Sequence, residues 1–163
     1  MRTKDFNRGY SLSEVLVVMA LISTIAVISG PALIGQMSHI RLKRAARDVT
    51  AELNAARFKA IAQNARYRVE FTLYASASTP DAYSLSSWNA GTSAWEDYPT
   101  RPRRELPANT NITSPGESFN VEFRPNGTST GAAICIQNTS ETSDRMKLTV
   151  STSTGQIVIS TGC

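Results

Sequence analysis

RGYSLSEVLVVMALISTIAVI, residues 8–28, decides the fold of this chain, because it joins a short basic leader to a long apolar run. Between Tyr10 and Ile34 the only charged residue is Glu14. An apolar helix of this length, rising about 1.5 Å per residue, can span about 30 Å of hydrocarbon. A carboxylate inside such a helix costs about 2.5–3.5 kcal/mol, so its default interpretation is functional. Residues 10–34 are therefore predicted to form a hydrophobic transmembrane helix.

The leader, residues 1–9, has its charges and its glycine before the apolar segment. It is too short for a secretory signal with its own apolar core, and it lacks a cleavage site between small residues. Cleavage after Gly9 would keep the hydrophobic helix in the mature chain and place the new N-terminus at Tyr10. The leader charges predict a cytoplasmic N-terminus and an exported C-terminal part.

Residues 35–64 change to an amphipathic pattern. Apolar residues recur at alternating steps of four and three, which gives one stripe along a helix: Leu42, Ala46, Val49, Leu53, Ala56 and Ala60. The opposite surface is basic, and it is either a solvated face or a contact for phosphate. A β-sheet of the same chain is the expected cover for the stripe, with a coiled-coil partner as the alternative.

Residues 65–163 carry the signature of short strands. Tyr67, Val69, Phe71 and Leu73 alternate with polar residues, and similar patterns occur at 82–88, 119–123, 132–137, 146–151 and 156–160. Residues 99–117 are expected to be irregular, because four prolines exclude regular central strands. A long helix followed by antiparallel strands is an α+β fold, with a β-rich globular head packed on the helix.

Two cysteines occur, Cys135 and Cys163, both in the Ser/Thr-rich head. An even cysteine count in an exported domain favours one disulfide, which would stabilise the head by roughly 3–4 kcal/mol if the geometry permits. The alternative is two unrelated thiols.

The leader and helix resemble the class III signal of type IV pilins and type II secretion pseudopilins, whose usual pattern is G-F-T-L-I-E. Here it stands as Gly9-Tyr10-Ser11-Leu12-Ser13-Glu14, with Tyr in place of Phe and serines at two other places. The resemblance implies that a prepilin peptidase cleaves after Gly9 and methylates the amine of Tyr10. It also implies that Glu14 pairs with the Tyr10 amine of a neighbouring subunit, which would supply the cation that a buried carboxylate needs. A glutamate that snorkels to the membrane surface is the alternative.

Other parts resemble one branch of that family, the FimT/FimU-type minor pilins and the H-type minor pseudopilin. The resemblance lies in the basic helix segment 41–61 and in the strand and turn at 121–127, which read VEFRPNG. Similar helices carry a proline near Pro31, where a kink is expected. The chain is thus expected to be a minor pilin in the bacterial inner membrane, with a periplasmic head, that assembles with other subunits. A type II secretion minor pseudopilin is the alternative.

The sequence shows no catalytic motif and no phosphate-binding glycine loop, so neither an enzyme, a cofactor nor a small-molecule substrate is expected. His39 is the only histidine and has no ligand neighbours in the sequence, so no metal site is expected. DNA binding in natural transformation is a further alternative, with Arg101, Arg103 and Arg104 as contacts and Tyr98 or Trp95 for base stacking. Some FimT-like proteins bind DNA through a late G-R-x-R segment, but the matching residues 155–158 here read GQIV and lack both arginines.

Overall fold

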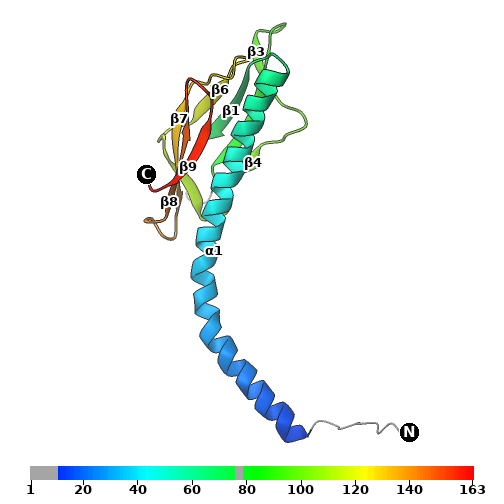
Figure 1. Cartoon of the computed structure of the whole chain (residues 1–163), viewed down its shortest axis with the longest axis vertical. Coiled ribbons are helices and arrows are strands. Elements are labelled where there is room, and N and C mark those ends of the chain that lie inside the picture. Colours follow the sequence, from blue (N-terminus) through cyan, green and yellow to red (C-terminus); the bar gives the residue numbers. More distant parts are fainter. Residues whose placement is uncertain (1–10, 76–78) are drawn as a thin grey trace, which may run out of the picture. The chain divides into compact units, whose positions relative to one another are not determined.

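The computed structural model describes residues 11–75 and 79–163, apart from the side chains of residues 27–36. The predicted cleavage site at Gly9 and Tyr10 lies outside the described residues. The chain divides into two compact units, Met1–Met37 and Ser38–Cys163. The helix α1 (Leu12–Ala62) belongs to both units, and nine strands follow it in the described residues of the second unit (Figure 1).

The helix α1 is continuous, although the sequence predicts a transmembrane segment to residue 34 and an amphipathic one from residue 35. The backbone at Gly30 and Pro31 is helical, so the helix does not end there. The kink expected at Pro31 remains a prediction, because it concerns residues whose side chains are not described. In the described part of the chain, no helix is long and apolar enough to cross a membrane.

The C-terminal half of α1 is held by its apolar stripe. All six residues of the predicted stripe, from Leu42 to Ala60, are completely buried. They pack in one hydrophobic core with apolar residues from both sheets of the head. The cover of the stripe is therefore a β-sheet of the same chain, as predicted. Burial of each Leu or Val of the stripe contributes about 1.5–3 kcal/mol relative to an exposed one.

The first sheet contains five strands: β1 (Tyr67–Thr72), β2 (Ala82–Asn89), β3 (Ala94–Asp97), β4 (Arg104–Glu105) and β6 (Phe119–Phe123). Its order is β3-β2-β1-β6, with β4 also paired to β2, and all pairs are antiparallel. Tyr67, Val69 and Phe71 are buried while the residues between them are half-buried, which confirms the predicted alternation. Phe71 stacks on Phe119 of β6, with ring centroids 4.6 Å apart.

The second sheet contains β5 (Thr110–Ser114), β7 (Ala132–Asn138), β8 (Arg145–Val150) and β9 (Ile157–Thr161), in the order β5-β7-β8-β9. The head therefore holds two sheets where the sequence suggested one. The prediction that residues 99–117 are irregular was partly wrong, because β4 and β5 fall in this range. Both are short, and β5 lies at a sheet edge, where flanking prolines remove no ladder bond.

Candidate functional site

The N-terminal unit presents the apolar part of α1 to its surroundings. Every described side chain from Leu12 to Ala26 is exposed, and large apolar residues such as Leu16 and Ile25 are 62% and 64% exposed. Ser11 directly precedes α1, and its carbonyl accepts the amides of Glu14 and Val15 at 3.0 and 3.2 Å. This surface is far more apolar than the exterior of a soluble helix, which indicates that other molecules cover it.

Glu14 lies in the first turn of α1, where the free amides of a helix N-terminus favour a negative charge. It is exposed and stands beside Val15 and Val18 on the helix surface. The carboxylate is thus presented outward from an apolar surface. If this surface is covered, the buried carboxylate is costly unless a cation compensates it.

The basic loop 101–104, the predicted nucleic-acid contact, is engaged within the head. Arg101 lies 2.8 Å from Glu52 of α1, and Arg104 lies 3.9 Å from the same carboxylate oxygen. The side chain of Glu52 is only 4% exposed, and its other oxygen, Oε1, has no hydrogen-bond partner. Arg103 donates a hydrogen bond to the hydroxyl of Tyr74. These arginines therefore attach the loop to the head.

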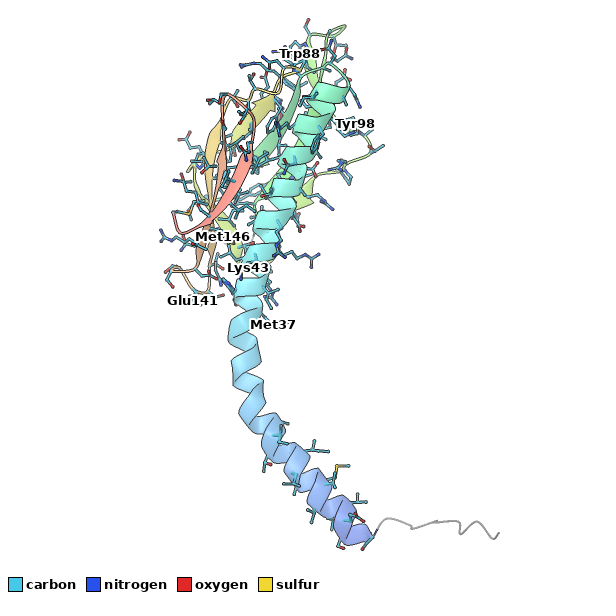
Figure 2. All side chains as sticks on the ribbon, in the orientation of Figure 1. Met37, Lys43, Trp88, Tyr98, Glu141 and Met146 are labelled. Carbon is cyan, nitrogen blue, oxygen red and sulfur yellow. A yellow bond between two sulfur atoms is a disulfide. The ribbon has the colours of Figure 1, made fainter. Side chains whose placement is uncertain are left out.

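The aromatic residues predicted to stack bases contact other side chains of the head, although the amide of Arg101 donates to the carbonyl of Tyr98 at 3.0 Å. Lys59 donates a hydrogen bond of 2.9 Å to the hydroxyl of Tyr98, labelled in Figure 2, and its ammonium lies 4.1 Å from the ring centroid. This hydrogen bond, with one from Gln63, lowers the pKa of Tyr98 from its ordinary value. Trp95 contacts Trp88 edge to face, at 5.4 Å between centroids.

Two arginines lie over the rings of the Trp88–Trp95 pair: Arg66, which directly precedes β1, and Arg68, which belongs to β1. The guanidinium of Arg66 lies 4.4 Å from the Trp88 ring, and that of Arg68 lies 4.4 Å from the Trp95 ring. Arg66 also pairs with Glu122 at 3.6 Å. The structure therefore brings together cations and aromatics that the sequence analysis did not connect, because they become neighbours only through strand pairing.

Two further contacts of carboxylates within the head were not predicted from the sequence. Asp81 is buried and accepts the amides of Tyr74 and Ile112 at 2.9 and 2.8 Å, which ties the segment that follows β1 and the residue before β2 to β5. His39 places its Nδ1 within 2.9 and 3.0 Å of the two carboxylate oxygens of Asp144. An isolated Asp or His in the sequence gives no signal for such a pairing.

Cys135 and Cys163 form a disulfide, as the cysteine count favoured, with their Cα atoms 6.0 Å apart. The bond connects β7 to the residue that follows β9 by two positions. Because β8 lies between β7 and β9, the bond ties the edge of the second sheet to its interior strand. Within the described residues, no group of three His, Cys, Asp or Glu side chains is placed to hold a metal ion.

Comparisons with known proteins agree with this architecture. Among solved structures, the type IV minor pilin FimU of Pseudomonas aeruginosa matches with a TM-score of 0.55 at 19% identity, over 73% of this chain and 87% of that one. The minor pseudopilin EpsH from the type 2 secretion system of Vibrio cholerae matches with a TM-score of 0.56 at 12% identity, over 74% and 97%. At these identities the two matches show the fold alone. No curated protein sequence matches the chain significantly.

Two family profiles match the sequence. The prokaryotic N-terminal methylation motif matches residues 5–30, which include Gly9 and Glu14. The family described as type II transport protein GspH matches residues 45–155, which is more than half of the chain and most of the head. The protein therefore belongs to the GspH family of type IV pilin-like minor pilins and pseudopilins, structural subunits with the pilin fold.

Proposed function

We propose that this chain is a minor subunit of a type IV pilus, anchored in the inner membrane before assembly and located at the tip or initiation complex of the filament. The observation that carries the proposal is the uncovered apolar surface of α1 with Glu14 in its first turn. Such a surface needs either lipid or the helices of other subunits as cover. The match of residues 5–30 to the methylation motif supports this assignment.

In this proposal Gly9 and Glu14 act together. A prepilin peptidase cleaves after Gly9 and methylates the new amine at Tyr10. In the filament, the ammonium of Tyr10 on a neighbouring subunit lies against Glu14, which compensates the carboxylate and fixes the axial register of the helices. Residues 10–34 cross the inner membrane before assembly, with the N-terminus cytoplasmic and the head periplasmic. The chain itself catalyses no reaction.

Replacement of Glu14 tests the charge pair. We expect Glu14→Ala to enter the membrane fraction normally and to be strongly depleted from sheared filaments, measured by immunoblotting both fractions. Ser13→Ala is the matched control, because Ser13 is an exposed neighbour without the charge. Normal incorporation of Glu14→Ala would contradict the charge pair.

Processing is tested separately by N-terminal sequencing and mass spectrometry of the mature protein. The proposal predicts a chain that begins with N-methylated Tyr10. A chain that retains residues 1–9 in assembled filaments would contradict it.

A second candidate function is that of a minor pseudopilin in type II secretion. It is supported by the GspH family match and by the structural similarity to EpsH, whose TM-score of 0.56 is close to the 0.55 for FimU. Deletion of the gene separates the two candidates: loss of surface filaments indicates a pilus subunit, and loss of an exported protein from the medium indicates a secretion subunit. DNA binding by the loop is not favoured, because Arg101, Arg103 and Arg104 are engaged by Glu52 and Tyr74.

A further inference from the structure

The strand β9 forms an open edge of the second sheet. In the described part of the chain it pairs only with β8. The amide of Ser151 donates to the carbonyl of Gln156, and the amide of Gly162 donates to the carbonyl of Arg145. These two bonds show which residue pairs between β8 and β9 are hydrogen-bonded and which are not. Hydrogen-bonded pairs alternate along antiparallel strands, so the N–H and C=O groups of Ile157, Ile159 and Thr161 point to the open edge.

The sequence of β9, IVIST, lacks the features that usually protect such an edge. It contains no proline, no charge and no interruption in its register with β8. Val158 is 52% exposed and Ile159 is 36% exposed. An apolar, uncharged, open edge is a template for another strand, so the strand indicates a site for pairing with a partner.

One flank of α1 runs beside this sheet, as three contacts along its length show. A Cβ on Gly155, just before β9, would lie 3.3 Å from Arg57, and one on Gly127 would lie 3.6 Å from Ile61. At the other end of the sheet, His39 is bonded to Asp144, which precedes β8. Helical spacing places a single row of residues along this flank: His39, Lys43, Arg47, Thr50, Asn54, Arg57 and Ile61.

This row carries three cations and no carboxylate. Lys43 and Arg47 are exposed, and neither they nor Arg57 form an ion pair within the described residues. The Nε of Arg57 is buried and has no hydrogen-bond acceptor. It therefore lies beside the start of β9 as a donor that lacks a partner, which costs free energy unless a ligand accepts from it.

The strand next to the open edge adds to this positive field. Arg145 and Lys147 of β8 lie in register with Gly162 and Ser160, and no acid stands on β9 itself. The turn before β8 holds two carboxylates: Asp144 bonds His39, and Glu141 is exposed. An acidic strand at this edge would thus pair with the free N–H and C=O groups of β9. Its carboxylates would lie near the cations of α1 on one side and of β8 on the other.

We propose that the open edge of β9 and the cationic row Lys43–Arg47–Arg57 bind an extended, acidic segment of a partner subunit by β-strand addition. The segment pairs with the backbone of Ile157, Ile159 and Thr161, and its carboxylates face the cations. This inference deepens the proposed function, on which it rests for the kind of partner, by naming the chemistry of that partner's contact. Strand addition to the head does not require assembly of the helices.

A synthetic peptide tests the proposal on the purified full-length chain in detergent micelles. The probe is fluorescein-labelled TVEVEVT, and binding is measured by fluorescence anisotropy. We expect saturable binding that weakens with salt. A peptide with lysine in place of glutamate, and one N-methylated at alternate amides, should bind at least about tenfold more weakly, because they lack the charge or the backbone donors. Equal binding of all three peptides would overturn the proposal.

Two pairs of variants locate the site. Lys43→Glu with Arg47→Glu should weaken binding of the acidic peptide by about tenfold or more. Arg41→Glu with Arg44→Glu, an equal charge change outside the row, should change it by less than about twofold. Ile159→Pro removes an edge-facing N–H without removing a bond to β8 and should abolish binding, with folding checked by circular dichroism. Equal losses in both charge pairs would contradict the assignment.

Other occupants of the edge give different results. A duplex DNA that binds the micellar chain and is lost with Lys43→Glu and Arg47→Glu, while the acidic peptide does not bind, would overturn the proposal in favour of nucleic acid. A dimer in analytical ultracentrifugation that Ile159→Pro dissociates would overturn it in favour of a second copy of this chain. Failure of filament incorporation with intact peptide binding would contradict the proposed function and leave this inference standing.

Discussion

The two halves of α1 differ in what covers their apolar residues. From Leu42 to Ala60 the apolar stripe is completely buried by the chain's own sheets, whereas Leu12 to Ala26 is exposed throughout. The halves also place their carboxylates differently: Glu52 is buried with two arginines nearby, and Glu14 is exposed. The C-terminal half of α1 completes its interactions within one chain, whereas the apolar residues of the N-terminal half are left for other molecules to cover.

The largest expected effect comes from shortening a buried residue of the stripe. Leu53→Ala should lower the free energy of unfolding of the head by about 3–5 kcal/mol, because it leaves a cavity in a fully packed core. Leu16→Ala, in the exposed half, should change it by less than about 0.5 kcal/mol. Urea denaturation followed by circular dichroism measures both. Similar losses for the two variants would contradict the comparison.

Removal of the disulfide should have the next largest effect. Cys135→Ser with Cys163→Ser opens a loop of 28 residues, and the chain-entropy model gives a loss of about 3–4 kcal/mol. The loss should be confined to the head, because both cysteines lie there. The same denaturation experiment with and without reductant checks it. Reductant should destabilise the wild type and leave the double variant unchanged.

Neutralisation of the buried carboxylate should have a smaller effect. Glu52→Gln should cost about 1–2 kcal/mol, because Arg101 loses its charged partner but is 42% exposed and can be hydrated. It should also increase the proteolytic sensitivity of the loop 101–104. Asp48→Asn, which affects an exposed pair at 3.7 Å, should cost less than about 0.5 kcal/mol. If Glu52→Gln leaves proteolysis at the loop unchanged, the carboxylate does not hold it.

The smallest effect concerns the tyrosines of the head at alkaline pH. Burial raises the pKa of Tyr67 and Tyr83, so each contributes stability below its ordinary pKa of 10.0 that is lost as the pH rises through the folded-state pKa. The stability contributed by Tyr98 has the opposite pH dependence, because the hydrogen bond from Lys59 lowers its pKa. This contribution is present above pH 10.0 and is lost as the pH falls through the folded-state pKa. Ultraviolet titration should show one tyrosine that ionises early, and Lys59→Met should remove that early phase.

The sequence predicted those parts of the fold that depend on local pattern. The stripe from Leu42 to Ala60 and the alternation of Tyr67, Val69 and Phe71 follow from helix and strand periodicity, and the structure confirms both. The division of the head into two sheets was not predicted, because strand order depends on non-local pairing. The strands β4 and β5 were missed because the prolines around them were taken to exclude strands. Proline excludes only central strands and is tolerated beside edge strands.

The candidate sites divide in the same way. Glu14 was identified because a charge in an apolar run is visible in the sequence, whereas the engagement of Arg101 and Arg104 by Glu52 was not. Glu52 follows Val49 by three positions and therefore lies next to the buried stripe, which was the one signal that could have indicated its burial. The open edge of β9 required knowledge of strand order.

Photocrosslinking from the exposed half of α1 tests the central claim most directly. A benzophenone amino acid at position Leu16, which is 62% exposed, is incorporated in cells that carry the assembled system. We expect a crosslinked adduct of this chain with another pilin-like subunit, identified by mass spectrometry, and its loss in the Glu14→Ala background. Crosslinks to lipid alone in cells with assembled filaments would contradict the claim that other subunits cover this half of the helix.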